Sequence, residues 1–129
     1  MNWVAGVILL SLIEYLVFGA LVGRARGKYA IAAPAVSGHP LFERYFRVHQ
    51  NSLEQLIVFI PSLWLFGVYV SPMWAAILGA IFLVARIVYG AAYISAPEKR
   101  GPGAMLSGVI QFILVLGALY GVVRSIVVP

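Results

Sequence analysis

Three polar side chains share one helical face at the start of an apolar segment. Arg47, Asn51 and Glu54 follow one another at i, i+4 and i+7 within RYFRVHQNSLEQ, which runs directly into LIVFIPSLWLFGVYV. At this spacing the three side chains point the same way from an α-helix. A charged side chain costs about 2.5–3.5 kcal/mol near the centre of a bilayer, so charges persist there mainly where they pair or bind a ligand. This stripe is therefore a candidate binding site.

A second polar stripe has a similar periodicity. Arg86, Tyr89 and Tyr93 lie at i, i+3 and i+7 in a later apolar segment, and they present a guanidinium and two phenols on one face. Arg100 follows seven residues after Tyr93, beyond the start of the turn sequence PEKRGPG, and a short helical extension would place it at the end of that face. Tyrosines at such positions are also typical of packing at the membrane interface.

Bases outnumber acids around these stripes. The arginines and glutamates concerned are Arg24, Arg26, Arg44, Arg47, Arg86 and Arg100 against Glu43, Glu54 and Glu98. An ion-pair network that joins the helices would account for part of this set. The surplus favours an anionic ligand, and carboxylates in particular, because a guanidinium can donate two parallel hydrogen bonds to a carboxylate.

The sequence predicts no metal centre. It contains no cysteine or aspartate and only two histidines, His39 and His49, so one chain cannot assemble a tight cluster of metal ligands. Without cysteine, any thiol chemistry must use the sulfur of a substrate. His49 is interpreted from its type and place as a polar residue near a helix start. Glu14 is the acid of the first apolar segment, and it is compatible with helix packing, proton transfer or, as we favour, pairing with an arginine.

The elements that must position these residues are membrane-spanning helices. Of the 129 residues, 63% are hydrophobic and 10% are charged, which leaves too few polar side chains to cover a soluble globule. About 20 apolar residues in a helix cross the hydrocarbon layer with every backbone group paired. The sequence predicts an all-α integral membrane protein of one domain, a bundle of four transmembrane helices at about 3–22, 44–70, 73–97 and 103–125.

The basic residues predict the orientation of this bundle. Seven of the nine Lys and Arg residues fall in or beside the first and third connections, whereas the opposite side has only Arg124. By the positive-inside rule, loops 23–44 and 95–103 face the cytoplasm and both termini lie on the other side. The first apolar segment lacks the basic start and the cleavage site of a signal peptide, so we expect it to be retained. Nucleic acid binding is not expected, because no aromatic-interleaved soluble module accompanies the bases.

Two blocks of this sequence resemble one known family. RYFRVHQNSLEQLIVFIP is similar to the second-helix signature of the MAPEG family, the membrane-associated proteins in eicosanoid and glutathione metabolism. The matching positions are Arg47, Asn51 and Glu54, the preceding Glu43 and Arg44, and His49, a histidine typical of microsomal glutathione transferases. ARIVYGAAYISAPEKRGPGAMLSG resembles the third helix and following turn of type-3 microsomal glutathione transferases, and the match includes Arg86, Tyr89, Tyr93 and Arg100.

The resemblance implies a fold, a co-substrate and a set of contacts. It implies a homotrimer that binds glutathione between adjacent subunits, near the cytoplasmic side, with no metal. The glutathione-binding residues that it implies are Arg24 or Arg26, Arg47, His49, Asn51, Glu54, Arg86, Tyr89 and Tyr93. Tyr89 and Tyr93 would contribute from a neighbouring subunit. Gln55 stands where the leukotriene-C synthase branch usually has a tyrosine, which argues against a leukotriene substrate.

The catalytic residue that the resemblance implies is Arg100, which matches an arginine held to bind the sulfur of glutathione and stabilise its thiolate. An alkyl thiol with a pKa near 8.5 is mostly protonated at neutral pH, whereas its anion is the nucleophile. The implied activity is conjugation of glutathione to lipophilic electrophiles that dissolve in the membrane, with reduction of lipid hydroperoxides as a side activity.

Two other functions remain open on the sequence. A small proton-coupled multidrug exporter would also have four spans and one acid in its first helix, here Glu14, but the arginine-rich site would repel cationic drugs. A non-catalytic MAPEG member would bind lipid or a partner protein without turning over glutathione. The arginine at position 100 argues against this second alternative.

Overall fold

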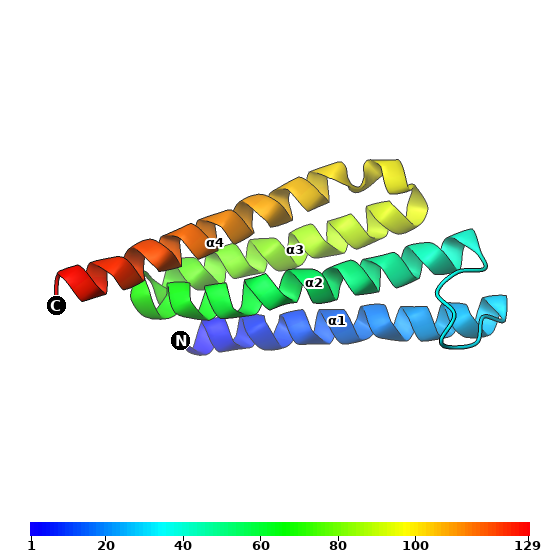
Figure 1. Cartoon of the computed structure of the whole chain (residues 1–129), viewed down its shortest axis with the longest axis horizontal. Coiled ribbons are helices and arrows are strands. Elements are labelled where there is room, and N and C mark those ends of the chain that lie inside the picture. The colour runs from blue at the N-terminus through cyan, green and yellow to red at the C-terminus, as the bar shows by residue number, and fades with distance from the viewer.

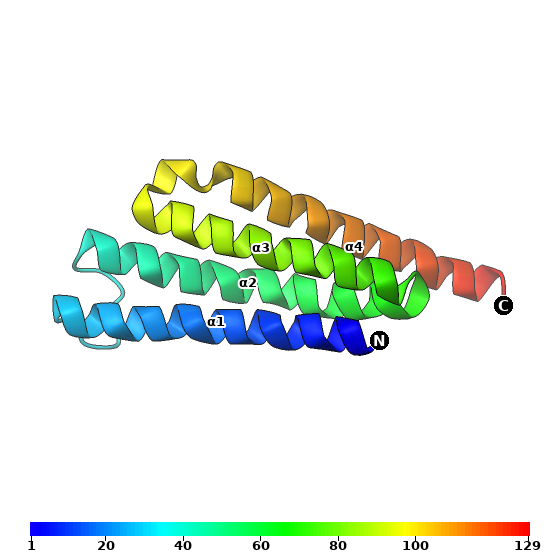
Figure 2. The same cartoon turned by 180° about the vertical axis from the view of Figure 1, so that it is seen from behind.

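The computed structural model describes all 129 residues and forms a bundle of four long helices (Figure 1). The elements are α1 (Asn2–Tyr29), α2 (Pro40–Tyr69), α3 (Pro72–Ser95), the short 3₁₀ helix η1 (Pro97–Arg100) and α4 (Gly101–Val127). Each of the four long helical segments is long and apolar enough to cross a membrane. Both chain ends lie at one end of the bundle, as Figures 1 and 2 show from opposite sides. The predicted all-α, four-helix membrane fold is confirmed.

Local signals set the helix starts beside the short connections. Pro40 opens α2 after His39, whose Nδ1 accepts a hydrogen bond of 3.1 Å from the backbone N–H two residues on. Pro72 opens α3 after Ser71, whose hydroxyl accepts a hydrogen bond of 3.2 Å from the backbone N–H three residues on. Proline suits the first helical position because an N–H there would have no partner within the helix.

The first connection is shorter than the sequence pattern predicts. The expected loop covers 23–44, whereas α1 continues to Tyr29 and α2 already begins at Pro40. Gly23 does not end the helix, because the following residues include good helix formers, and Arg26 and Lys28 in the last turn complement the negative end of the helix dipole. The helix ends at Ala30, which adopts the left-handed conformation with φ of 52°. The other helix ends fall within three residues of their predicted positions.

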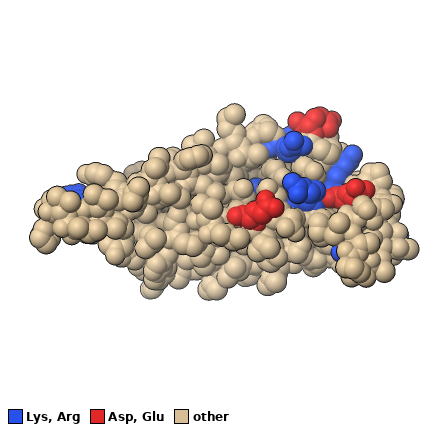
Figure 3. Space-filling view, viewed as in Figure 1, with Lys and Arg blue, Asp and Glu red and all other residues tan.

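The apolar core fills the half of the bundle that contains the chain ends. Phe59 of α2 stacks on Phe82 of α3 with ring centroids 3.9 Å apart, and Leu63 and Leu114 are fully buried beside them. Charged side chains gather instead toward the other end of the bundle, over the first and third connections (Figure 3). The fold therefore separates a tightly packed apolar half from a half with polar groups.

Candidate functional site

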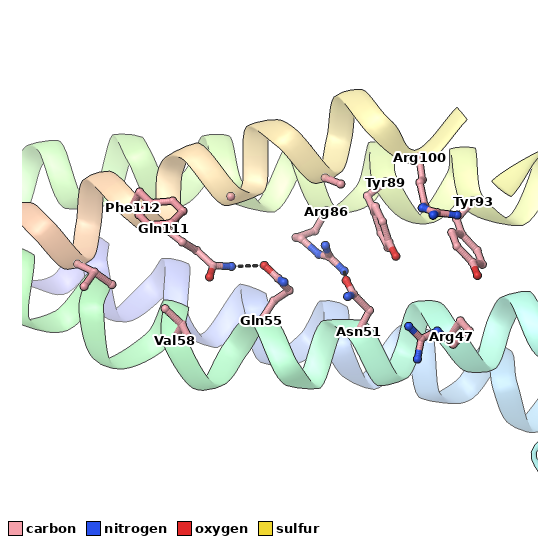
Figure 4. A pocket seen from close by; sticks show the side chains of 13 residues that line it. Arg47, Asn51, Gln55, Val58, Arg86, Tyr89, Tyr93, Arg100, Gln111 and Phe112 are labelled. Atoms are coloured by element: carbon pink, nitrogen blue, oxygen red, sulfur yellow. Dashed lines mark hydrogen bonds between the residues drawn. The ribbon is translucent and has the colours of Figure 1, made fainter. Parts of the chain in front are cut away.

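Residues from both predicted polar stripes face one cavity of about 580 Å³ between α2, α3 and α4 (Figure 4). Six of the ten predicted site residues line it: Arg47 and Asn51 from α2, Arg86, Tyr89 and Tyr93 from α3, and Arg100 from η1. Its lining includes three arginines and no carboxylate. The cavity therefore has the positive charge expected of an anion-binding site.

Arg86 forms the deep polar wall of this cavity. It is only 2% exposed, and its Nη2 donates to Asn51 Oδ1 at 2.7 Å and to Ser52 Oγ at 3.3 Å. Its guanidinium carbon also lies 4.2 Å from the centre of the Tyr89 ring, a distance typical of a cation–π contact. These contacts hold Arg86 in place and orient the amide of Asn51 at the cavity wall.

Arg86 also borders a second, much smaller cavity. This space of about 10 Å³ is lined in part by Glu14 of α1, Ser52 and Arg86. The Nε of Arg86 is buried and has no hydrogen-bond partner in the protein. Glu14 is thus the acid that the fold places beside the buried arginine, on the side away from the large cavity.

Arg100 stands at the outer end of the cavity. Its side chain is exposed, its guanidinium carbon lies 5.7 Å from the centre of the Tyr93 ring, and its Nη1 donates to the carbonyl oxygen of Pro97 at 3.5 Å. Arg47 faces the same end from α2 (Figure 4). Arg100 therefore presents an exposed guanidinium at this end of the cavity, beside the face of the Tyr93 ring.

Arg44 ties the start of α2 to the turn that carries Arg100. Its Nη1 donates to the carbonyl oxygens of Ile94 at 3.0 Å and Ser95 at 3.3 Å. These carbonyls lie in the last turn of α3, where the helix itself supplies no donors. From the sequence, Arg44 was placed in the arginine surplus and in the family signature, but these contacts were not predicted, because the partners are backbone atoms 50 and 51 residues away.

Two predicted residues of α2 do not face the cavity within one chain. Glu54 is exposed and lies outside the cavity lining. His49 points toward α1, where its ring stacks on Tyr15 with centroids 4.4 Å apart, and it also sits close above Gly19. His49 therefore packs against α1 in the single chain, and its contact with Tyr15 needs no bound ligand.

The two predicted arginines of α1 also lie outside the cavity. Arg26 donates to the carbonyl oxygen of Ala35 at 2.7 Å, and its guanidinium carbon lies 4.9 Å from the centre of the Phe42 ring. Arg24 lines a separate cavity of about 170 Å³ between the end of α1 and the start of α2. Arg26 therefore stabilises the first connection within the chain. Arg24 lies beside a small, separate pocket.

Sequence reasoning missed a pair of glutamines in the cavity. Gln111 of α4 donates a hydrogen bond from Nε2 to Oε1 of Gln55 of α2, and both line the cavity (Figure 4). Beyond the pair, the lining becomes apolar at Val58, Phe112 and Val115. The available signal was a polar amide in each of two apolar spans, since such residues often join helices within a membrane.

The arrangement can bind an anion with hydrogen-bonding groups at one end and an apolar molecule at the other. The structure contains no group of three or more His, Cys, Asp or Glu side chains placed to hold a metal ion. Three guanidinium groups, one amide and two phenols surround the polar end. The site therefore has the donors to position an acid and to stabilise negative charge.

Known sequences show the same pattern over nearly the whole chain. The sequence model of the MAPEG family matches residues 4–120. An uncharacterized protein from Synechocystis is 48% identical over 120 residues, which cover 93% of this chain and 88% of that protein. Microsomal glutathione S-transferase 2 from Homo sapiens is 40% identical over 122 residues, covering 94% and 82% respectively. Leukotriene C4 synthase from Rattus norvegicus is 32% identical over 117 residues, covering 91% and 78%.

Proposed function

This chain belongs to the MAPEG family, and we propose that it is an integral membrane glutathione transferase. The observation that carries the proposal is the convergence of Arg47, Arg86 and Arg100 on one cavity whose lining contains no carboxylate. The relatives named microsomal glutathione S-transferase 2 support the same reading. The proposed co-substrate is glutathione, and the proposed second substrate is a lipophilic electrophile.

The charges of glutathione match those of the cavity. Glutathione carries two carboxylates, one amine and one thiol, so guanidinium groups and an amide can each engage one of its polar groups. We assign its carboxylates and peptide to Arg47, Asn51 and Arg86, with Tyr89 and Tyr93 along the same wall. The cavity volume of about 580 Å³ lies in the range of small-molecule sites.

Arg100 is the residue that we assign to the sulfur. It lies at the outer end of the cavity, where the other cation, Arg47, is assigned to the carboxylates, and no carboxylate of the lining competes for it. A cation beside a thiol favours the thiolate, and each unit by which the thiol pKa falls corresponds to about 1.4 kcal/mol. The thiolate then attacks the electrophilic carbon, the sulfur–carbon bond forms, and the displaced electron pair leaves with the departing group. No covalent bond to the protein is needed.

The electrophile would reach the sulfur from the lipid. Val58, Phe112 and Val115 line the cavity beyond the polar groups, and the outer faces of the helices are apolar along the span. A lipid hydroperoxide could enter in the same way, and two glutathione molecules would reduce it to the alcohol and water and form glutathione disulfide. We also propose a homotrimer, with the first and third connections in the cytoplasm. The charged side chains over these connections in Figure 3 support this orientation.

Formation of the thiolate tests the proposed function directly. Adding glutathione to the purified protein should produce the ultraviolet difference absorbance of a thiolate at a pH where free glutathione is mainly a thiol. Neither an exporter nor a lipid-binding protein should ionise the thiol. A folded protein that gives no such absorbance and binds no glutathione would rule out the transferase.

Replacing Arg100 tests the assignment of the sulfur. Arg100→Ala should lower kcat/KM for conjugation by about 100-fold, a loss typical of removing one group that stabilises negative charge in a reaction. Glutathione affinity should fall much less, because Arg47 and Arg86 remain. Conjugation kinetics and glutathione titration measure the two effects. Lys99→Ala is the matched control, since Lys99 is the exposed cation beside Arg100 and lies outside the cavity lining. Equal turnover in the two variants would reject Arg100 as the thiolate partner.

A further inference from the structure

The glutamine pair stands where the polar end of the cavity meets its apolar end. Figure 4 shows Gln55 and Gln111 joined across α2 and α4, with Arg86 and Tyr89 on one side and Val58 and Phe112 on the other. An interhelical hydrogen bond between amides is a common way to join helices in a membrane. That role would use one donor and one acceptor of the pair.

The pair retains hydrogen-bonding groups that no protein atom uses. Each glutamine amide has two N–H donors and one carbonyl acceptor, so one mutual hydrogen bond leaves donors on both residues and a free carbonyl on one. Neither amide is among the buried polar atoms that lack a partner, and both side chains are partly exposed. The free groups of Gln55 and Gln111 therefore face accessible space, and both residues line the large cavity.

An apolar groove continues from the glutamine pair along α2 and α4. It has a volume of about 390 Å³ and shares Val58 and Val115 with the large cavity. Val58 lies one helical turn beyond Gln55, and Val115 lies one turn beyond Gln111. An aliphatic molecule in this groove would meet the two amides just before it meets the polar end of the cavity.

We propose that Gln55 and Gln111 select electrophiles whose reacting group carries an oxygen, with alkyl vinyl ketones, in which the alkyl chain is attached to the carbonyl carbon, as the class that fits best. The proposal rests on the proposed transferase function and names its acceptor. The hydrocarbon chain of such a molecule fills the groove, and its carbonyl oxygen accepts a hydrogen bond from a free amide N–H. Its vinyl group, which carries the β-carbon, then points on toward the polar end of the cavity and the thiolate. A haloalkane of similar length fills the groove equally well but has no oxygen for the amides.

When the thiolate adds to such an electrophile, the amide donor acts at the carbonyl oxygen. The thiolate sulfur bonds to the β-carbon, the carbon–carbon π pair forms a new double bond between the α-carbon and the carbonyl carbon, and the carbonyl π pair moves onto the oxygen as an enolate. The proton that glutathione released to solvent is replaced by one that water delivers to the α-carbon, so no oxidant or reductant is needed. A hydrogen bond that is aimed at the oxygen stabilises the charge that develops there. Displacement of iodide from an iodoalkane develops no charge on oxygen.

The experiment compares two aliphatic electrophiles in the full-length protein. The values of kcat/KM for 1-nonen-3-one and 1-iodohexane, which both carry a hexyl chain, are measured for the wild type, Gln55→Leu and Gln111→Leu, and the ratio of the two values is compared. Leucine keeps the volume and helix propensity of glutamine but has no amide. Gln50→Leu is the control, because Gln50 is exposed on α2 and lies outside both cavities.

Each leucine variant should lower the nonenone-to-iodohexane ratio by at least about tenfold, the loss expected when one donor to a developing oxyanion is removed. The control ratio should stay within about twofold of the wild type, since it loses no such donor. An unchanged ratio in both variants, with thiolate still formed, would show that the pair only joins the helices. A wild-type protein that forms no thiolate would overturn the transferase function and this proposal with it.

A measurement on the wild type keeps the proposal testable if a variant does not fold. In mixed micelles, 2-nonanone should inhibit conjugation of 1-iodohexane at about tenfold lower mole fraction than nonane, because only the ketone can accept a hydrogen bond from the amides. Equal inhibition by the ketone and the alkane would overturn the proposal.

Discussion

Arg86 shows how one side chain organises the site. It is buried, and it bonds to the amide of Asn51 and the hydroxyl of Ser52, so its position fixes the cavity wall. A buried cation is costly unless its charge is compensated. Its neighbouring acid is Glu14, which shares the small cavity on its other side. We therefore expect Glu14 to act on the cavity through Arg86, as the source of its counter-charge.

Removing Glu14 should destabilise the bundle. Glu14→Leu leaves the charge of Arg86 uncompensated, and we expect a loss of roughly 1–3 kcal/mol in the free energy of unfolding, less than for a fully buried pair because Glu14 is partly exposed. Arg86→Leu should cost a similar amount. The double variant should lose clearly less than the sum, and unfolding in detergent measures all three. Strictly additive losses would show that the two charges do not interact.

The sequence predicted that polar residues at helical spacing on α2 form the site, but it did not predict which side of the helix faces the cavity. Arg47, Asn51 and Glu54 share one helical stripe, yet the cavity follows Arg47, Asn51 and Gln55, so Glu54 falls beyond its edge. Residues three to four apart lie within about 60° of one another around a helix, and a small rotation of α2 about its axis decides which of them faces the cavity. That rotation depends on packing between helices, which spacing within one helix does not contain.

At the scale of elements, close packing of α4 on α3 places the turn that carries Arg100. A Cβ atom built on Gly103 would lie 2.7 Å from the backbone nitrogen of Tyr89 and 2.8 Å from its Cα. Such distances leave no room for any larger residue, because the neighbouring atoms are backbone. Gly103 is therefore needed where the first turn of α4 meets the cavity wall.

Adding one methyl group at this contact should disturb the site. Gly103→Ala should push the start of α4 away from Tyr89, lower conjugation at least about tenfold and cost roughly 1–3 kcal/mol of stability through overpacking. Gly101→Ala is the matched control, since a Cβ there meets nothing within 4 Å. Activity and thermal unfolding of both variants measure the effect. Equal behaviour of the two would mean that α4 can shift without moving the site.

The helices themselves follow from composition, and their ends follow from local chemistry. The four spans were predicted because long apolar runs can satisfy their backbone groups in a membrane only as helices. The first connection was predicted too long because its bounds were placed where the apolar runs stop, whereas both helices continue into the polar residues beyond, α1 through Gly23. Glycine lowers helix stability by about 1 kcal/mol, which neighbouring helix formers and packing can outweigh. Contacts such as Arg44 to the end of α3 were not predictable, because backbone acceptors carry no signal in the sequence.

At the scale of the whole molecule, one chain gathers six of the predicted site residues and leaves four outside. Arg47 and Arg100 face the same cavity of the same chain. Arg24, Arg26, His49 and Glu54 lie outside it. In the homotrimer that we propose, residues outside one chain's own cavity can reach glutathione only at the cavity of a neighbour. The division of the site between chains can therefore be tested by mixing inactive subunits.

Mixed trimers should show which residues act at the cavity of their own chain and which act at the cavity of a neighbouring chain. Two subunit types with different affinity tags are coexpressed, and assemblies that contain both tags are purified for activity assays. Arg47→Ala mixed with Arg100→Ala should restore nothing, because every cavity then lacks one of the two arginines. Arg26→Ala mixed with Arg100→Ala should restore about one third of the wild-type activity, because a ring of two subunit types has one junction at which an intact Arg100 meets an intact Arg26 of its neighbour. Rescue by the first mixture would show that Arg47 and Arg100 act from different chains, and no rescue by the second would show that Arg26 and Arg100 act from the same chain. A fully active Arg26→Ala homotrimer would remove Arg26 from the site.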